Sequence, residues 1–315
     1  MSRCARKRWR YLGLAVTAGY AVIAAGCAAQ HRHGPPLAIG VESQYANVLA
    51  QIGAPYIKVR AIETNPNTDP HEFQASPAIA EKIAHASLIV ENGLGYDAWI
   101  KPLIAANPNP ARRIFIVRRL LNLPADTVNP HLWYGQKTMP AVAAAAATAF
   151  TAMAPQHAAY FAAQVRRFDA SLQSWHAQIA AFRAQYSGTP VAVTEPVADM
   201  MLKAAGCRIL TPLALQLAIM NGTDPAPQDV ATEEALLRDR KVKVFVYNQQ
   251  VTDPLTASFL QLARAEHIPV VGVYELMPEP GYDYQRWMLA EIRALRAAVA
   301  HGISTARLGG AVSTQ

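Results

Sequence analysis

The stretch Gln156–Tyr186, QHAAYFAAQVRRFDASLQSWHAQIAAFRAQY, decides how the rest of the chain is interpreted. Its large apolar residues recur at alternating intervals of four and three: Phe161, Val165, Phe168, Leu172, Trp175, Ile179, Phe182 and Tyr186. This spacing predicts one helix with a continuous apolar stripe. Gly188 and Pro190 follow and predict its end. At about 1.5 Å per residue, the helix would be a rod of roughly 45 Å.

Short apolar runs alternate with helical patterns on both sides of this stretch. Before it, the predicted strands are 37–41, 56–62, 87–91 and 113–117, and the predicted helices are 43–52, 77–86 and 96–106. After it, the predicted strands are 191–194, 243–247 and 269–274, and the predicted helices are 198–205, 227–240, 254–266 and 284–300. Such alternation is typical of parallel sheets flanked by helices. We therefore predict an α/β fold with two lobes, each with a mostly parallel sheet, bridged by one long helix. A coiled-coil dimer is the alternative interpretation of the stripe.

The N-terminus has the pattern of a targeting segment. Five basic residues precede an uncharged, mostly apolar run from Tyr11 to Ala25. That run is too short to span a bilayer comfortably and is typical of a signal-peptide core. It ends in Ala24-Ala25-Gly26-Cys27, which suggests a bacterial lipoprotein cleavage site with the lipid on Cys27. Plain secretion and a short uncleaved anchor are the alternatives.

The predicted organisation follows from these segments: signal peptide 1–26, tether 27–36, N-terminal α/β lobe 37–155, linker helix 156–187, C-terminal α/β lobe 188–301 and flexible tail 302–315. Removing the signal peptide takes away five cations and no acids, which lowers the net charge from +7 to +2. The high overall pI is therefore no indication of nucleic-acid binding. Cys207 would be the one unmodified cysteine, so we expect a core thiol and no intramolecular disulfide.

Motifs for common enzyme classes are missing from the sequence. The segment GLGYDAW has two glycines but lacks the third of a dinucleotide-binding loop, and no G-x-S-x-G occurs. A hydrolase or dehydrogenase therefore has no positive support.

Four residues of the types that bind metal ions instead follow predicted strands or lie in rigid loops. They are His71 in NTDPHEFQASP, His131 in VNPHLWYGQKTMP, Glu195 in PVAVTEPVADMM and Glu275 in IPVVGVYELMPEP. Because ligands of open α/β sheets bind outside the carboxyl ends of the strands, these side chains could converge between the lobes. Two imidazoles and two carboxylates suit a divalent transition metal.

Each of these residues also has an ordinary interpretation. The two histidines could be solvated loop residues. Glu195 could cap a helix that begins at Pro196, since a carboxylate suits a helix N-terminus. Glu275 is poorly explained as a core residue, because it ends a strongly apolar strand.

At these positions the sequence resembles the substrate-binding lipoproteins of manganese- and zinc-importing ABC transporters, the cluster A-I or TroA-like group. The segments that carry the resemblance are DPHEFQASPAIAEKIAHASLIVENGLGYDAWI, NPHLW, TEPVADMMLKAAG and, less closely, VYELMPEPGYDYQRWMLAEIRAL. Together they extend over most of the chain, from about Leu37 to His301. The resemblance implies two α/β lobes joined by one long helix, with a metal ion between them.

The resemblance also implies which residues bind the metal. His71 and His131 fall on the two histidine ligands of the family. Glu195 falls on the third position, which is His in many zinc members and Glu in manganese members. The fourth ligand is usually Asp. Glu275 matches this place best, and the remaining candidates for it are Asp253, Glu279 and Asp283.

The function implied is that of an extracytoplasmic solute-binding protein. It would capture one manganese or zinc ion and deliver it to the permease of an ABC importer, without turnover. We expect a monomer in the periplasm or at the cell surface, anchored to the membrane through a lipid on Cys27. A secreted metalloenzyme, with Glu72 as a general base, or a surface adhesin with the metal as a structural staple are the alternatives.

Overall fold

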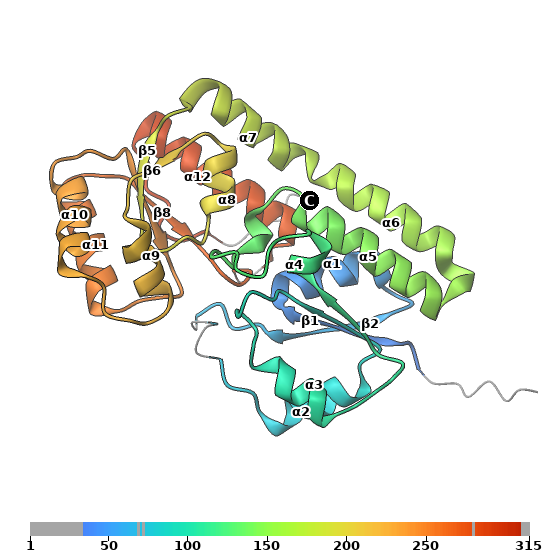
Figure 1. Cartoon of the computed structure of the whole chain (residues 1–315). Coiled ribbons are helices and arrows are strands. Elements are labelled where there is room, and N and C mark those ends of the chain that lie inside the picture. Colours follow the sequence, from blue (N-terminus) through green and yellow to red (C-terminus); the bar gives the residue numbers. More distant parts are fainter. Residues whose placement is uncertain (1–33, 68–69, 71–72, 279–280, 310–315) are drawn as a thin grey trace, which may run out of the picture. The chain divides into compact units, whose positions relative to one another are not determined.

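Two parallel four-stranded sheets form the framework of the chain in the computed structural model, which describes residues 34–67, 70, 73–278 and 281–309 (Figure 1). The strand orders are β2-β1-β3-β4 and β6-β5-β7-β8, so the same arrangement occurs twice along the chain. Every pairing between named strands is parallel. The strands are β1 (Leu37–Glu42), β2 (Lys58–Glu63), β3 (Leu88–Glu91), β4 (Arg113–Ile116), β5 (Pro190–Val193), β6 (Arg208–Ile209), β7 (Val244–Asn248) and β8 (Val270–Val273).

The helices connect these strands and cover both faces of each sheet. In the N-terminal half they are α1 (Ser43–Gly53), α2 (Pro77–His85), α3 (Ile100–Ala106), α4 (Val117–Leu120), the 3-10 turn η2 (Leu132–Tyr134) and α5 (Thr138–Met153). The 3-10 turn η3 (Pro155–His157), α6 (Ala158–Ser171) and α7 (Gln173–Tyr186) follow. In the C-terminal half they are α8 (Asp199–Ala204), α9 (Leu213–Met220), α10 (Pro227–Arg238), α11 (Pro254–Ala265) and α12 (Tyr284–His301).

Successive residues of the central strands enter two different cores. In β1, Ala38 packs into the core that contains α1 and α5, whereas Ile39 packs against α2 and α3. In β7, Val244 faces the first of these cores and Phe245 faces a separate core under α9, α10 and α11. This period of two explains why the strands are near-continuous apolar runs, since a parallel sheet is buried on both faces.

The turn from β1 into α1 brings the helix unusually close to its own strand. A Cβ atom on Gly40 would lie 2.1 Å from the backbone nitrogen of Ala46. Only glycine therefore fits at this position. The close approach places the first turn of α1 at the carboxyl end of the sheet, beside the candidate site.

The apolar stripe of the bridging segment is buried within this chain. Its large residues, including Phe161, Leu172 and Trp175, belong to one core that continues through both sheets. Figure 1 shows α6 and α7 following one another, with α5 beside α6 and α12 beside α7. The coiled-coil dimer is therefore the wrong interpretation, because the stripe packs against α1, α5 and α12 of the same chain.

The bridge differs from a straight rod at Leu172, where the α-helical pattern is interrupted between α6 and α7. The Ser171 hydroxyl donates a hydrogen bond of 2.6 Å to the carbonyl of Phe168, and the Leu172 N–H donates to the carbonyl of Asp169, three residues back. A serine that bonds the preceding turn competes with the helix ladder and bends it. The long bridging helix is therefore bent.

Further differences separate the structure from the expected elements. The short strand β6 and the helices α4 and α9 were not expected, and α3 begins at Ile100 rather than near Tyr96. The residues before α3 form turns instead of helix. There Gly93 and Leu94 have positive φ, and the Asp97 carboxylate accepts the N–H groups of Asn92 and Gly93.

Residues after α12 pair with the edge of the second sheet. The Gly272 N–H donates to the carbonyl of Thr305 at 2.9 Å, and the Thr305 N–H donates to the carbonyl of Val270 at 2.8 Å. An edge strand such as β8 exposes unpaired backbone groups, and this segment satisfies them. The described residues 302–309 thus differ from the flexible tail that the sequence suggested.

Residues 35–315 form one compact unit, separate from residues 1–34. Cys207 lies in the core as a buried free thiol, and burial raises its pKa to about 12. Within the described ranges, no helix combines the length and apolar character needed to cross a membrane. Cys27, His71 and Glu279 lie outside the described residues. The predicted boundaries of the signal peptide, tether and lobes stay predictions.

Candidate metal centre

His131 is buried, directly after Pro130 and before η2, so the solvated-loop interpretation is wrong for it. Its backbone N–H donates to Asn129 Oδ1, and its Nδ1 lies 2.9 Å from the same oxygen. Asn129 Nδ2 donates to the carbonyl of Pro196 at 2.7 Å, which fixes the orientation of the amide. Since Oδ1 can only accept, Nδ1 carries a proton, and Nε2 is the nitrogen that remains to bind a metal in the neutral ring. This is the tautomer in which Nε2 can bind a metal.

Glu275 is fully buried just after β8, and both halves of the chain hold it. From the N-terminal half, the Tyr96 hydroxyl donates to Oε2 at 2.9 Å and Gln44 Nε2 donates to the backbone carbonyl at 3.1 Å. From the C-terminal half, Asn248 Nδ2 donates to Oε1 at 2.7 Å. Oε2 also lies 3.4 Å from His131 Nε2. The carboxylate is therefore positioned against the imidazole predicted to bind metal.

Glu195 lies two residues after β5 and is also buried. Its Oε1 accepts a 3.0 Å hydrogen bond from Asn248 Nδ2, the group that also donates to Glu275. The next helix begins only at Asp199 and has no side-chain cap. The interpretation of Glu195 as a helix cap is therefore wrong, and its carboxylate faces the same site as Glu275.

Asn248, the last residue of β7, was not singled out from the sequence. It ends the buried strand VFVYN, as Glu275 follows VVGV and Glu195 follows PVAV. A polar residue at the end of an apolar strand was the signal that identified both glutamates. Applied to amides as well as carboxylates, the same signal identifies Asn248.

Two of the three alternatives for the fourth ligand have structural roles instead. Asp253 forms a capping box with Thr256 at the start of α11. Asp283 caps α12 by accepting the N–H of Arg286, and its other oxygen pairs with the Arg286 guanidinium at 3.0 Å. These interactions account for both carboxylates. The structure brings Glu275, and neither aspartate, into contact with His131.

The described residues supply only part of the predicted ligand set. His131, Glu195 and Glu275 come together, whereas His71 lies outside the described ranges. Within those ranges, no group of three or more His, Cys, Asp or Glu side chains is arranged to hold a metal ion. The four-residue ligand set therefore stays a prediction, and the geometry supports it through the contacts made by Asn248.

Acidic and phenolic groups surround the site on the side of the N-terminal sheet. Burial, and secondarily Glu275, raise the pKa of Tyr96 well above its usual range, so Tyr96 remains a neutral hydrogen-bond donor. Glu42, at the end of β1, lies in register with Glu63 of β2. Burial, and then the charge of Asp97, raise the pKa of the Glu42 carboxyl well above its usual range. Burial thus favours the uncharged forms of Glu42 and Tyr96, which act as neutral groups beside the site.

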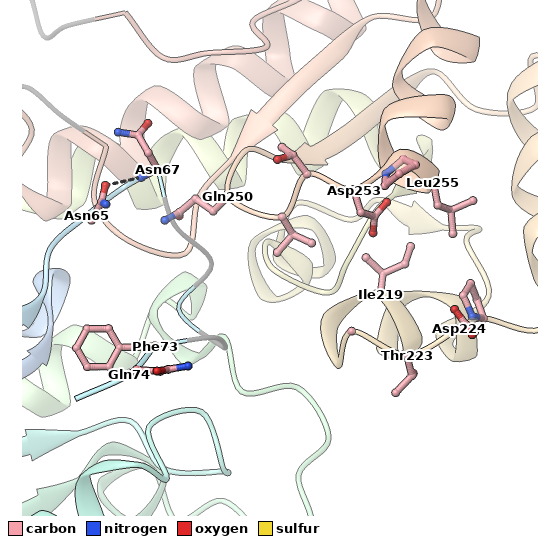
Figure 2. Close-up of a pocket in the computed structure, with 15 residues that line it drawn as sticks. Asn65, Asn67, Phe73, Gln74, Ile219, Thr223, Asp224, Gln250, Asp253 and Leu255 are labelled. Carbon is pink, nitrogen blue, oxygen red and sulfur yellow. Dashed lines mark hydrogen bonds between the residues drawn. The ribbon is translucent and has the colours of Figure 1, made fainter. Parts of the chain in front are cut away.

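A cavity of about 980 Å³ lies between the two halves of the chain (Figure 2). One side is lined from the N-terminal half by Asn65, Asn67, Phe73 and Gln74, and the other from the C-terminal half by residues 219, 222–225 and 250–255. Gln250 joins the cavity to the site, because its Oε1 accepts the backbone N–H groups of Glu275 and Leu276. The described lining contains no lysine or arginine, which suits passage of a cation.

Solved structures share this architecture. The periplasmic zinc-binding protein TroA from Treponema pallidum is 15% identical, with a TM-score of 0.71 over 86% of this chain and 100% of TroA. The nickel complex of the solute-binding protein FpvC from Pseudomonas aeruginosa is 16% identical, with a TM-score of 0.68 over 87% and 99%. A crystal structure of ZnuA is 15% identical, with a TM-score of 0.67 over 85% and 100%. At these identities the likeness establishes the two-sheet fold.

The family of this protein is established by comparing its sequence with known families. No curated protein matches it significantly. However, residues 42–298 match the family described as zinc-uptake complex component A, periplasmic, or ZnuA. The match begins at the last residue of β1 and ends within α12, so it includes seven of the eight strands, the bent bridge and all described site residues. The chain therefore belongs to the ZnuA family of periplasmic zinc-uptake components.

Proposed function

We propose that this protein is an extracytoplasmic solute-binding protein that captures one divalent transition metal ion, zinc or manganese, and delivers it to an ABC importer. The observation that carries the proposal is that His131 from one half of the chain lies beside Glu275 from the other, and that Asn248 holds Glu195 and Glu275 together. His71 would complete the ligand set. Family membership supports this function over a secreted metalloenzyme or a metal-stapled adhesin.

Binding would depend on the charge and protonation of these side chains. Two carboxylates neutralise a doubly charged ion, which offsets the cost of removing it from water. An imidazole must be neutral to bind, so affinity should fall as the pH drops through about 6.5. The Asn129 contact keeps His131 in the required tautomer.

Delivery would take place outside the cytoplasm, as the periplasmic family implies. A lipid on Cys27 would anchor the protein to the membrane, and the chain would act as a monomer beside the permease. No covalent step is required of the site residues, so the chemistry is binding and release.

Calorimetry on chelator-treated, dialysed protein tests the proposal. Wild type should bind one zinc or manganese ion per chain, and the double variant His71→Ala, His131→Ala should lose that binding. The matched control, His85→Ala, His301→Ala, removes two exposed histidines and should bind as wild type does. Wild-type protein that takes up neither ion, or a site variant with unchanged affinity, would refute the proposal.

A further inference from the structure

The side-chain amide of Asn248 forms hydrogen bonds through both its oxygen and its nitrogen. Its Oδ1 accepts the N–H of Gln250 at 3.0 Å, which fixes the orientation of the amide and turns Nδ2 toward the site. Nδ2 then donates to Glu275 Oε1 at 2.7 Å and to Glu195 Oε1 at 3.0 Å. An amide nitrogen has two hydrogens, so each carboxylate receives one of them.

The backbone of Asn248 is held as firmly as its side chain. Its N–H donates to Thr194 Oγ1 at 3.0 Å, and Thr194 immediately precedes Glu195. Asn248 is itself fully buried. The amide therefore has a defined position between the two carboxylates, and a substitution there changes the contacts of both together.

These hydrogen bonds divide the oxygens of Glu275 between two tasks. Oε1 accepts from Asn248, whereas Oε2 accepts from the Tyr96 hydroxyl at 2.9 Å and lies 3.4 Å from His131 Nε2. In Glu195 the oxygen Oε1 is likewise engaged by the amide. Asn248 turns one oxygen of each glutamate toward itself and away from the imidazole, so each glutamate would supply a single ligand atom; in Glu275 that atom is Oε2, whose second lone pair remains beside the Tyr96 hydrogen bond.

We propose that Asn248 determines metal specificity by holding Glu195 and Glu275 to one metal-binding oxygen each. The inference rests on the proposed function and goes beyond it by choosing between the two ions. With two imidazoles, two single oxygens give four ligands, the number that zinc takes in tetrahedral protein sites. Manganese favours octahedral, oxygen-rich coordination, which two bidentate carboxylates could approach. The amide therefore favours zinc over manganese.

The test compares the zinc-to-manganese affinity ratio of full-length wild type, Asn248→Ala and Asn248→Asp, by competition with a chelating dye. Both variants remove the amide donor, and Asp preserves its shape. Loss of such an outer contact lowers metal affinity by about 10–100-fold. We expect zinc affinity to fall by that factor and manganese affinity to fall less, so that the ratio drops by about tenfold or more. The control Asn221→Ala removes an exposed asparagine and should leave the ratio unchanged.

X-ray absorption on the manganese-loaded proteins supplies a readout that a general loss of stability would not move. The variants should show more oxygen neighbours from protein carboxylates than wild type. Equal losses of zinc and manganese affinity, or an unchanged ratio, would overturn the inference while the proposed function stands. Wild type that binds neither ion would refute both. If Asn248→Ala fails to fold by circular dichroism, the Asn248→Asp measurements decide.

Discussion

The carboxyl group of Glu291 makes the stability of this protein depend on pH. Glu291 lies on α12 and is fully buried. Its Oε1 accepts the indole N–H of Trp287 at 2.8 Å and lies 3.1 Å from the Tyr134 hydroxyl. Its Oε2 has no hydrogen-bond partner among the described residues. Burial raises the pKa of Glu291 from 4.5 to about 8, although the two hydrogen bonds act to lower it.

The direction of the effect follows from where the proton is held. Because the folded state keeps the proton up to about pH 8 and the unfolded chain releases it near 4.5, folding is favoured most below pH 4.5. Stability is lost progressively as the pH rises through this window. The pKa difference corresponds to about 5 kcal/mol at high pH, of which about 3 kcal/mol falls between about pH 5 and 8.

Urea unfolding of metal-free Glu291→Gln and wild type across this pH range measures the effect. Glutamine does not titrate, so the variant should gain about 3 kcal/mol relative to wild type between about pH 5 and 8. Contributions from other groups cancel in the difference. The control Glu234→Gln makes the same substitution at a partly exposed residue of α10 and measures the effect of the exchange outside the core. A flat difference for Glu291→Gln would refute the argument that this buried carboxyl holds its proton.

Three further predictions concern the bridge, the imidazole and a helix cap. Leu172→Ala should lower the free energy of unfolding by about 2–5 kcal/mol, because Leu172 is fully buried where α6 meets α7; a loss below 1 kcal/mol would contradict this. Asn129→Ala should weaken zinc binding by about 10–100-fold in calorimetry through the lost contact to His131, and unchanged affinity would count against it. Asp253→Ala should cost about 1 kcal/mol by removing the α11 cap, with metal affinity unchanged; a loss of binding would make Asp253 a ligand.

The sequence predicted most of the fold because its long-range signals are periodic. The central strands β1, β3, β5 and β7 have strong apolar runs, and the spacing from Phe161 to Tyr186 follows a buried face. The strand β6 was missed because Arg208–Ile209 is too short to carry a period. The interruption at Leu172 was missed because the apolar spacing continues through it, while its cause is the Ser171 hydroxyl.

The sequence predicted which residues could form the site, but it did not predict the contacts between them. The rule that ligands lie beyond the carboxyl ends of strands selected Glu195 and Glu275, which do lie together. Sequence could not separate Glu275 from Asp253 and Asp283, since the capping bonds that occupy those aspartates are formed only in the folded chain. Asn248 was missed because only carboxylates and imidazoles were considered as functional groups.

A crystal structure of the metal-loaded protein, with anomalous diffraction measured at the zinc and manganese absorption edges, would both locate the bound ion and identify it. We predict one anomalous peak within bonding distance of His131 Nε2, Glu195, Glu275 and His71. Its signal at the two edges identifies the ion, which the Asn248 argument predicts to be zinc. A peak at another place in the chain, or one bound by Asp253 or Asp283 in place of Glu275, would contradict the account.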